Sequence, residues 1–151
     1  GSPIPVIQES VAHFSQRARE REIDLSISAT GAGTVVDFDE TRIRQIISNL
    51  VENSLTHTPN GGSVNVDIFG GQDDIKILIT DSGIGISEAD LPRIFDQFYR
   101  ADQSRTRTTG GAGLGLTIVK RLVEAHGGEI SVTSNAESGT IFRVVLPASR
   151  T

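Results

Sequence analysis

Cysteine, methionine and tryptophan are all absent from this sequence. Without cysteine, the chain has no disulfide, no cysteine-ligated zinc or iron–sulfur centre and no thiol nucleophile. Because methionine is missing, we expect the sequence to be part of a longer protein, and we interpret Gly1-Ser2 as a cloning remnant outside the fold. No apolar run approaches the roughly 18 residues that a membrane-spanning helix needs.

An excess of positive charge is also lacking. Lysine and arginine number 14 against 19 aspartate and glutamate residues, which gives a net charge of −5 at pH 7. We therefore expect no general electrostatic attraction to nucleic acid. Apolar residues make up 36% of the chain and charged residues 22%, which is typical of a folded domain rather than a disordered chain. The length suits a single domain, which we place at residues 3–151.

Hydrophobic periodicity predicts three main helices, over residues 6–20, 40–57 and 114–126. Asp39 is the expected N-cap of the second helix. In the third helix, Ile118, Leu122 and Val123 are expected to face the core. A short helix is also predicted over residues 88–95.

Alternating patterns predict strands over residues 24–29, 64–68, 75–79, 129–134 and 140–146, with a short extended piece at 35–38. Turn residues between the second and third strands, and between the last two, predict hairpins. Residues 97–112 have no useful periodicity and predict a mobile loop. The expected fold is therefore α+β, a two-layer sandwich with helices on one face of a largely antiparallel sheet.

An asparagine pair lies on the predicted helix 40–57. At 100° per residue, Asn53 lies 40° from Asn49, and His57 lies a further 40° around the helix. Together with Thr56 they form a polar band at the edge of the apolar stripe. Neutral amide oxygens in such a band can bind Mg²⁺, although asparagines at this spacing more often bond to backbone.

Two glycine-containing segments also carry chemical signals. Asp81 follows a predicted strand and can accept a hydrogen bond from an exocyclic amine, while Gly83 and Gly85 let backbone approach a flat ring closely. The segment 110–116, GGAGLGL, opens the last helix, where N–H groups suit an anion. Its spacing matches neither the dinucleotide fingerprint nor the P-loop. Taken alone, each segment has a plain alternative, a tight turn or a flexible linker.

A third segment, FDQFYR at residues 95–100, is followed by Arg105 and Arg107. Aromatic residues can anchor a loop whose arginines reach phosphate oxygens. A solvated basic loop is the alternative.

In this order and spacing, the asparagine pair, DSGIGI, FDQFYR and GAGLGL resemble the catalytic and ATP-binding domain of sensor histidine kinases. That fold is shared with DNA gyrase, Hsp90 and MutL. The resemblance runs from Val6 to Pro147, and the segment GAGLGLTIVKRLVEAHGG is typical of the kinase branch. It implies three helices on one face of a mixed, mostly antiparallel sheet, with ATP and Mg²⁺ as cofactors.

The resemblance also implies site residues. Asn49 and Asn53 would form the catalytic asparagine box, with Asn53 as the Mg²⁺ ligand, and Asp81 would receive the adenine amino group. Phe95 and Phe98 would mark the hinge of an ATP lid at about residues 97–112. The implied nucleotide-binding residues are Asn49, Asn53, His57, Asp81, Gly83, Gly85, Ile86, Phe98, Arg100, Arg105, Arg107, Gly111, Gly113, Leu114, Gly115, Leu116 and Thr140.

One departure from the family concerns phosphate binding. Family members often have lysine where this chain has Thr56, so the direct cationic contact from that helix is lost. Arg100, Arg105 or Arg107 is expected to replace it. His57 could stack near adenine or lie against phosphate, and a surface-edge imidazole is the alternative.

The motifs favour phosphoryl transfer over hydrolysis. The ATP-hydrolysing branches place a water-activating glutamate where this chain has Asn49, and Glu52 is expected to point away from the nucleotide. Catalysis would then come from positioning and charge stabilisation. A hydrolytic ATPase of the same fold and a nucleotide-sensing interaction domain are the alternatives.

None of the three histidines, His13, His57 and His126, has the sequence context of a phosphate acceptor. The resemblance therefore implies an acceptor histidine on a separate helical-hairpin dimerisation domain, with a response regulator as the indirect partner. It also implies that this domain is cytoplasmic in an inner-membrane sensor. We expect the isolated domain to be monomeric.

Overall fold

A computed structural model describes residues 1–31, 34–83, 85–86, 89–95, 112–135 and 139–148 of the chain. The helices are α1 (Ile4–Ala12), α2 (Ser15–Glu20), α3 (Glu40–His57) and α4 (Ala112–Ala125), with a short 3-10 helix, η1 (Leu91–Arg93). The strands are β1 (Asp24–Gly31), β2 (Ser63–Gly70), β3 (Asp74–Asp81), β4 (Glu129–Asn135) and β5 (Gly139–Pro147). Of these described helices, none is long and apolar enough to cross a membrane.

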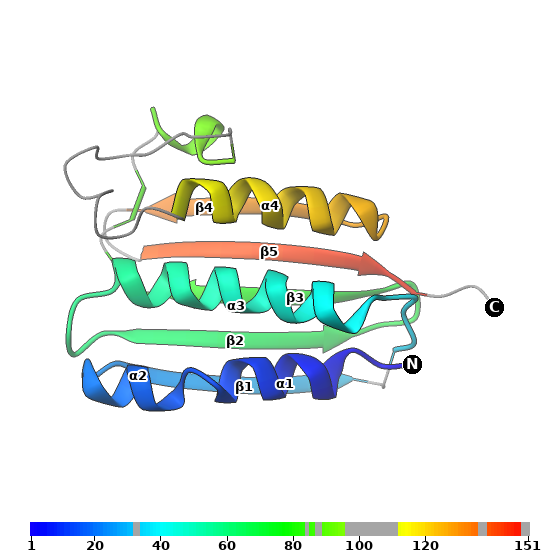
Figure 1. Ribbon diagram of the computed structural model, residues 1–151, viewed down its shortest axis with the longest axis horizontal. Helices are drawn as coiled ribbons and strands as arrows, with labels where there is room; N and C mark the ends of the chain where they lie inside the picture. The colour runs from blue at the N-terminus through cyan, green and yellow to red at the C-terminus, as the bar shows by residue number, and fades with distance from the viewer. Residues whose placement is uncertain (32–33, 84, 87–88, 96–111, 136–138, 149–151) are drawn as a thin grey trace.

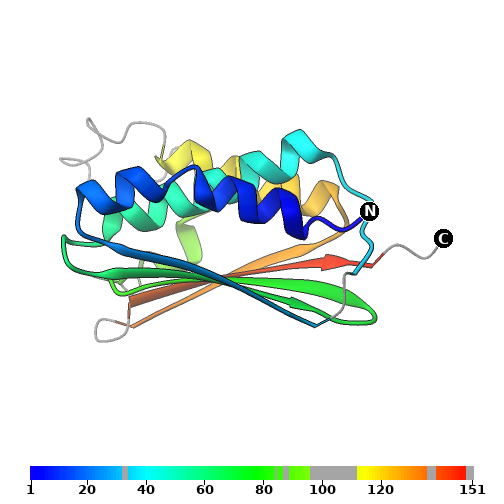
Figure 2. The same ribbon diagram turned by 90° about the horizontal axis from the view of Figure 1, so that it is seen from below.

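The five strands form one sheet in the order β1-β2-β3-β5-β4. Strands β1 and β2 are parallel, and the other three neighbouring pairs are antiparallel. The helices cover one face of this sheet, with α3 between α1 and α4 (Figures 1 and 2). The predicted α+β sandwich with a mixed, mostly antiparallel sheet is confirmed.

The core lies between α3 and the inner face of the sheet. The predicted apolar stripe of α3 is buried, and the alternating residues of β2 and β3 face it. Full burial of one such side chain stabilises the fold by about 1.5–3 kcal/mol. The buried side chains at this interface are Ile43, Ile46, Ile47, Leu50, Val51, Val64, Val66, Ile68, Ile75, Ile77 and Ile79.

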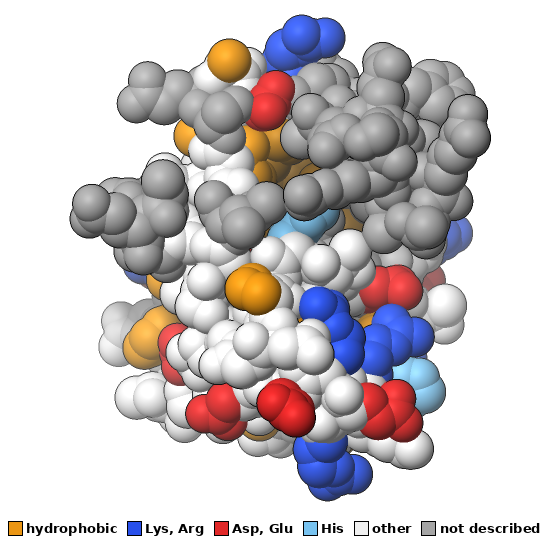
Figure 3. Space-filling model, turned by 90° about the vertical axis from the view of Figure 1, so that its left-hand side faces the viewer, with side chains coloured by type: hydrophobic (Ala, Val, Ile, Leu, Met, Phe, Trp, Pro, Cys, Tyr) orange, Lys and Arg blue, Asp and Glu red, His pale blue; other side chains and the backbone are white. Residues whose placement is uncertain are grey.

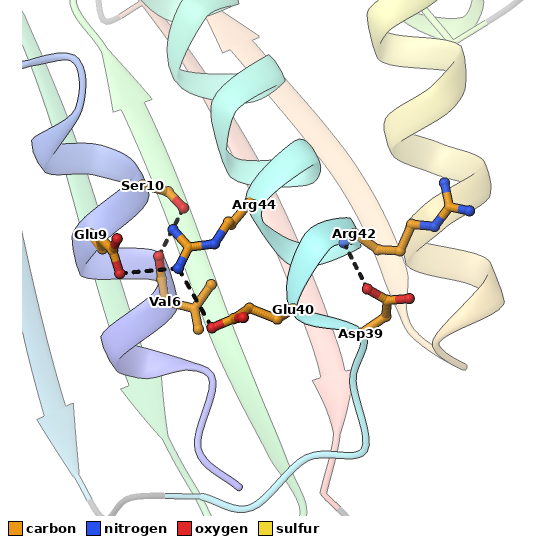
Figure 4. Close-up of polar contacts among 7 residues, drawn as sticks. All are labelled: Val6, Glu9, Ser10, Asp39, Glu40, Arg42 and Arg44. Atoms are coloured by element: carbon orange, nitrogen blue, oxygen red, sulfur yellow. Dashed lines mark hydrogen bonds and ion pairs between the residues drawn. The ribbon is translucent and has the colours of Figure 1, made fainter.

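Helix α3 begins as predicted. The side chain of Asp39 accepts a hydrogen bond from the backbone N–H of Arg42 at 3.3 Å (Figure 4). Arg44 then bridges Glu9 of α1 at 3.0 Å and Glu40 at 3.5 Å. These groups are exposed, so each ion pair adds little stability, and only the pair with Glu9 joins α3 to α1.

Two predicted helices differ from the observed ones. The helix over residues 6–20 is broken between α1 and α2, where Phe14 leaves the helical conformation and is buried. Near residues 88–95, the described part forms only η1, which begins at Leu91 and contains Pro92 in its first turn. Proline fits that first turn because its missing N–H is not needed there.

The predicted inward face of α4 was partly wrong. Ile118 is 38% exposed, whereas Leu116, Val119 and Val123 are buried at spacings of three and four residues. The apolar stripe therefore lies one step around the helix from the predicted one, and Leu122 is only partly buried at its edge. Of the predicted loop at residues 97–112, the part up to residue 111 lies outside the described residues.

Candidate nucleotide-binding site

The candidate site lies where four elements meet at one end of the molecule. The C-terminal end of α3 and the start of α4 lie there, on the helical side of the sheet, near the end of β3 and the start of β5 (Figure 1). Figure 3 views the molecule from this end. Because β3 and β5 are antiparallel, Asp81 at the end of β3 pairs directly with Thr140 at the start of β5.

Asp81 is the central buried polar group of the site, with 3% of its surface exposed. Its Oδ1 accepts hydrogen bonds from the backbone N–H groups of Gly83, at 2.9 Å, and Thr140, at 3.3 Å. Both backbone donors therefore select the same oxygen, and Oδ2 receives neither of them. The carboxylate is held in one orientation by strand and loop backbone.

Burial makes the charged form of Asp81 less favourable than it is in water. Burial raises the pKa of Asp81 above its ordinary value, and this effect exceeds the opposing ones. The backbone N–H groups of Gly83 and Thr140, the charge of His57 and the hydroxyl of Ser54 all lower the pKa, in that order. A ligand that donates a hydrogen bond to the carboxylate would relieve this cost of burial.

Glycine is required at two points around Asp81. A Cβ on Gly83 would collide with the backbone carbonyl oxygen of His57, and one on Gly139 would collide with that of Asp81. Gly139 also has a φ of 84°, in the left-handed region that favours glycine. These positions bring the loop after β3 against α3, and the start of β5 against β3. Gly85, with a φ of 76°, continues the same loop.

A hydroxyl network links the loop to the last hairpin. The backbone N–H of Ile86 donates to Ser134 Oγ at 2.5 Å, and Ser134 Oγ lies 3.0 Å from Thr140 Oγ1 and 3.3 Å from the carbonyl oxygen of Gly139. Ile86 and Thr140 were predicted from the sequence, but Ser134 was missed. One serine in an alternating strand gives no signal that distinguishes such an anchor from a surface residue.

The four side chains of the polar band of α3 differ in how far they are buried. Asn53 is 9% exposed, Asn49 is half-buried, and Thr56 and His57 are exposed. The Thr56 hydroxyl donates to the carbonyl oxygen of Glu52 at 2.8 Å, within its own helix. This gradient matches the predicted position at the edge of the apolar stripe.

Glu52 makes its contact on another side of α3. It forms an ion pair with Arg17 of α2 at 3.1 Å. This contact agrees with the expectation that Glu52 points away from the band formed by Asn49 and Asn53.

Ser54 was also missed from the sequence. Its side chain is fully buried, and its hydroxyl makes no hydrogen bond of ordinary geometry within the described residues. It lies close enough to the Asp81 carboxylate to lower the pKa of that group. A buried serine on a helix has the sequence pattern of a small core residue, so no motif could have identified it.

The start of α4 contributes backbone groups, and no charged side chains, to the candidate site. Gly113, Leu114 and Gly115 lie in its first turn, because the helix begins two residues earlier than predicted. Leu116 is buried in the core, and the hydroxyl of Thr117 donates to the carbonyl oxygen of Phe95 at 3.0 Å. The remaining predicted site residues, Phe98, Arg100, Arg105, Arg107 and Gly111, lie outside the described residues.

Phe95 is anchored at the start of the predicted lid. Its ring packs edge-on against the buried ring of Phe142, with 6.3 Å between the centroids, and the ammonium group of Lys120 lies 5.9 Å from its centroid. The chain that leads into residues 97–112 is therefore fixed to both α4 and β5.

Residues 38–150 match the family described as histidine kinase-, DNA gyrase B-, and HSP90-like ATPase. The chain is 36% identical over 134 residues to the sensor histidine kinase WalK of Bacillus subtilis, and the match covers 87% of this chain and 22% of WalK. Among solved structures, the mycobacterial sensor histidine kinase MprB has a TM-score of 0.84 at 28% identity and covers 100% of this chain and 99% of its own. Full-length ShkA in complex with AMPPNP has a TM-score of 0.82 at 28% identity, over 97% of this chain and 30% of ShkA.

The fold and the matches define an ATP-binding domain of the kind found in sensor histidine kinases. The chain belongs to the family of histidine kinase-, DNA gyrase B- and HSP90-like ATPases. It spans about a fifth of the length of WalK. The resemblance indicated by its motifs is confirmed.

Proposed function

We propose that this domain binds Mg-ATP and donates the γ-phosphoryl group to a histidine on a separate helical-hairpin domain, for relay to a response regulator. The observation that carries the proposal is the buried Asp81 carboxylate, which two backbone N–H groups hold beside the helix that bears Asn49 and Asn53. The family membership and the AMPPNP complex of ShkA support it. Residues 3–151 would act as one monomeric domain on the cytoplasmic side of a membrane-anchored sensor.

Adenine recognition is assigned to Asp81. Its Oδ2 can accept a hydrogen bond from the 6-amino group of adenine, because Oδ1 is already occupied by Gly83 and Thr140. A hydrogen bond to a charged group contributes roughly 1.5–3 kcal/mol. A 6-oxo purine would instead place a carbonyl oxygen against the carboxylate. Gly83, Gly85 and Ile86 would lie along the ring.

Mg²⁺ binding is assigned to Asn53, with Asn49 beside it. Within the described residues no group of three histidine, aspartate or glutamate side chains could hold a metal ion. A nearly buried amide oxygen still fits Mg²⁺, which commonly takes one or two protein ligands and completes its shell with waters and phosphate oxygens. When bound, the ion would neutralise charge on the β- and γ-phosphates.

The phosphates would lie toward the start of α4. Exposed backbone N–H groups at a helix N-terminus attract anions. We assign this role to the glycine-rich segment that leads into the first turn of α4. Arginines of the lid would supply the positive charge that relatives often provide with a lysine at the position of Thr56. The residues in this assignment are Arg100, Arg105, Arg107, Gly111, Gly113, Leu114, Gly115 and Leu116, with His57 at the other side of the nucleotide.

Phosphoryl transfer is favoured over hydrolysis because Asn49 occupies the position where the hydrolytic branches have a general base. Asn49 carries an amide, which accepts no proton at neutral pH, and the carboxylate of Glu52 is paired with Arg17 of α2. The chain therefore positions the phosphates without activating water. An imidazole from another domain would then be the attacking nucleophile.

The test combines this domain, γ-labelled ATP and the separately produced helical hairpin of its parent. We expect the label on a hairpin histidine, and we expect Asp81→Asn and Asn53→Ala to abolish that labelling. Asn60→Ala, an exposed asparagine in the loop after α3, is the matched control and should label normally. Phosphate release without hairpin labelling would favour the hydrolytic ATPase, and nucleotide binding without either reaction would favour a nucleotide-sensing domain.

A further inference from the structure

Three polar side chains lie side by side across the sheet at the edge of the candidate site. Asp81 at the end of β3 pairs with Thr140 of β5, and Thr140 pairs in turn with Ser134 of β4. Because directly paired residues of neighbouring strands share one face of a sheet, the three side chains form a single row. Asp81 and Thr140 are buried and Ser134 is half-buried, so this row lies on the face that the helices cover.

The loop after β3 is tied to this row at two points. Near the start of the loop, the backbone N–H of Gly83 donates to Asp81 Oδ1 at 2.9 Å. Further along, the backbone N–H of Ile86 donates to Ser134 Oγ at 2.5 Å. Strand β5 lies between β3 and β4 in the sheet, so the loop reaches across β5 before it meets its second tie.

The hydroxyl of Ser134 is held in place by the last hairpin. Its Oγ lies 3.0 Å from Thr140 Oγ1 and 3.3 Å from the carbonyl oxygen of Gly139. Either of these oxygens can take the one hydroxyl proton of Ser134, which leaves the lone pairs of Oγ for the N–H of Ile86. A Cβ on Gly139 would lie 1.9 Å from the carbonyl oxygen of Asp81, so this end of the hairpin packs closely against β3.

We propose, building on the assigned ATP site, that Ser134 is a positioning residue for nucleotide binding. Its hydroxyl oxygen holds the backbone of Ile86 and thereby sets where the loop that carries Gly83, Gly85 and Ile86 lies beside the purine ring. Ser134 acts through this loop, without being a ligand-binding residue itself. A loop that the sheet already holds in place needs little further ordering when the base binds, and such preorganisation raises affinity.

Removal of the hydroxyl should release the loop without unfolding the sheet. In Ser134→Ala, we expect the Ile86 amide to exchange with deuterium faster than in wild type, whereas the Gly83 amide, which Asp81 holds, stays protected. Affinity for Mg-ADP should fall about 3- to 10-fold, as expected for the loss of one neutral hydrogen bond. Ser134→Thr keeps a hydroxyl on a side chain that suits a strand, and it should restore both properties.

Amide exchange followed by NMR spectroscopy and calorimetric titration of Mg-ADP test this on wild type and the variants. Ser131→Ala is the matched control, because Ser131 is a serine of the same strand that is exposed on the opposite face of the sheet. It should behave as wild type in both measurements.

Several outcomes would overturn the role of Ser134 and leave the ATP site standing. They are wild-type protection of Ile86 in Ser134→Ala, faster exchange of Ile86 with unchanged affinity, and losses that Ser134→Thr does not recover. Loss of protection at Gly83 as well as Ile86 would assign Ser134 to the stability of the fold and would also overturn its positioning role. If wild-type protein bound no Mg-ADP, the proposed function would be overturned, and this inference with it.

Discussion

Arg21 caps the C-terminal end of α3 by donating from Nη2 to the backbone carbonyl oxygen of Thr58 at 2.7 Å. Its Nη1 also donates to the carbonyl oxygen of Leu55. The last carbonyl groups of a helix have no partner within the helix, and a cation there also complements the helix dipole. A residue that follows α2 therefore fixes the turn of α3 that carries Ser54 and His57.

We expect Arg21→Ala to lower the free energy of unfolding by about 1.5–3 kcal/mol, because two charged hydrogen bonds to partly buried carbonyl groups are lost. Urea unfolding monitored by circular dichroism would measure the change. Nucleotide affinity should fall as well, since the end of α3 is less well positioned. Arg19→Ala removes an exposed arginine of the neighbouring helix α2 and should change either quantity little.

The fold was predictable from the sequence because apolar residues recur at regular helical or strand spacing in most elements. The bounds of α3 and its N-cap were right, and the alternation of β2 and β3 indicated the correct inward faces. The break at Phe14 was missed because a ring that turns into the core still fits a helical spacing. Ile118 was wrongly predicted to face the core because α4 has apolar residues on more than one face. Packing against α3 determines which face is buried.

Residues of the candidate site could be proposed from the sequence only where a residue type or a glycine spacing indicates the chemistry. Asp81, Gly83 and Thr140 were all identified, and the structure brings them into direct contact. Ser54 and Ser134 were not, because a serine gives the same signal whether it anchors a loop or fills a core. The two roles differ in which atoms surround the serine hydroxyl, and tertiary packing determines those atoms.

We expect the ionised Asp81 carboxylate to lower the free energy of unfolding, although nucleotide binding needs it. Its pKa is raised in the folded state, so the folded protein binds the proton more tightly than the unfolded chain does. The ionised carboxylate therefore costs stability above the folded-state pKa, and this cost disappears as the pH falls toward the unfolded value of about 3.9. We expect Asp81→Asn to raise the free energy of unfolding at pH 7 by up to about 1 kcal/mol and to abolish nucleotide binding.

Thermal unfolding of both proteins between about pH 4 and pH 8 would measure this effect. The advantage of the variant should shrink toward the acid end of the range. Asp67→Asn is a suitable control, because Asp67 is on the outer face of β2 and bonds to the hydroxyl of Ser28. A variant less stable than wild type throughout would contradict the prediction.

His126 connects α3 and α4 at the ends that lie away from the candidate site. Its Nε2 accepts a hydrogen bond from the backbone N–H of Asp39, at 3.1 Å, and its Nδ1 lies 2.8 Å from the carbonyl oxygen of Leu122. The tautomer that satisfies both contacts carries its proton on Nδ1. We expect His126→Ala to destabilise the protein by about 1 kcal/mol, measured by urea unfolding, with His126→Gln closer to wild type because the amide can still accept.

The exposed His13→Ala serves as the control for that loss. His13 packs edge-on against Phe14, so its removal should cost less than the removal of a hydrogen-bonded tie between helices. Equal losses for the two variants would show that the Asp39 contact contributes nothing.

Finally, we expect the isolated domain neither to label itself nor to hydrolyse ATP at an appreciable rate. No side chain in the asparagine box can act as a general base, because Asn49 carries an amide. The three histidines also have other surroundings: His13 lies against Phe14, His126 is tied to Asp39, and His57 lies at the end of α3. Incubation with γ-labelled ATP should therefore give no stable phosphohistidine and little free phosphate, and Asn49→Glu should raise hydrolysis at most slightly. Strong labelling at one histidine, lost when that residue is replaced by glutamine, would show that the acceptor lies within this chain.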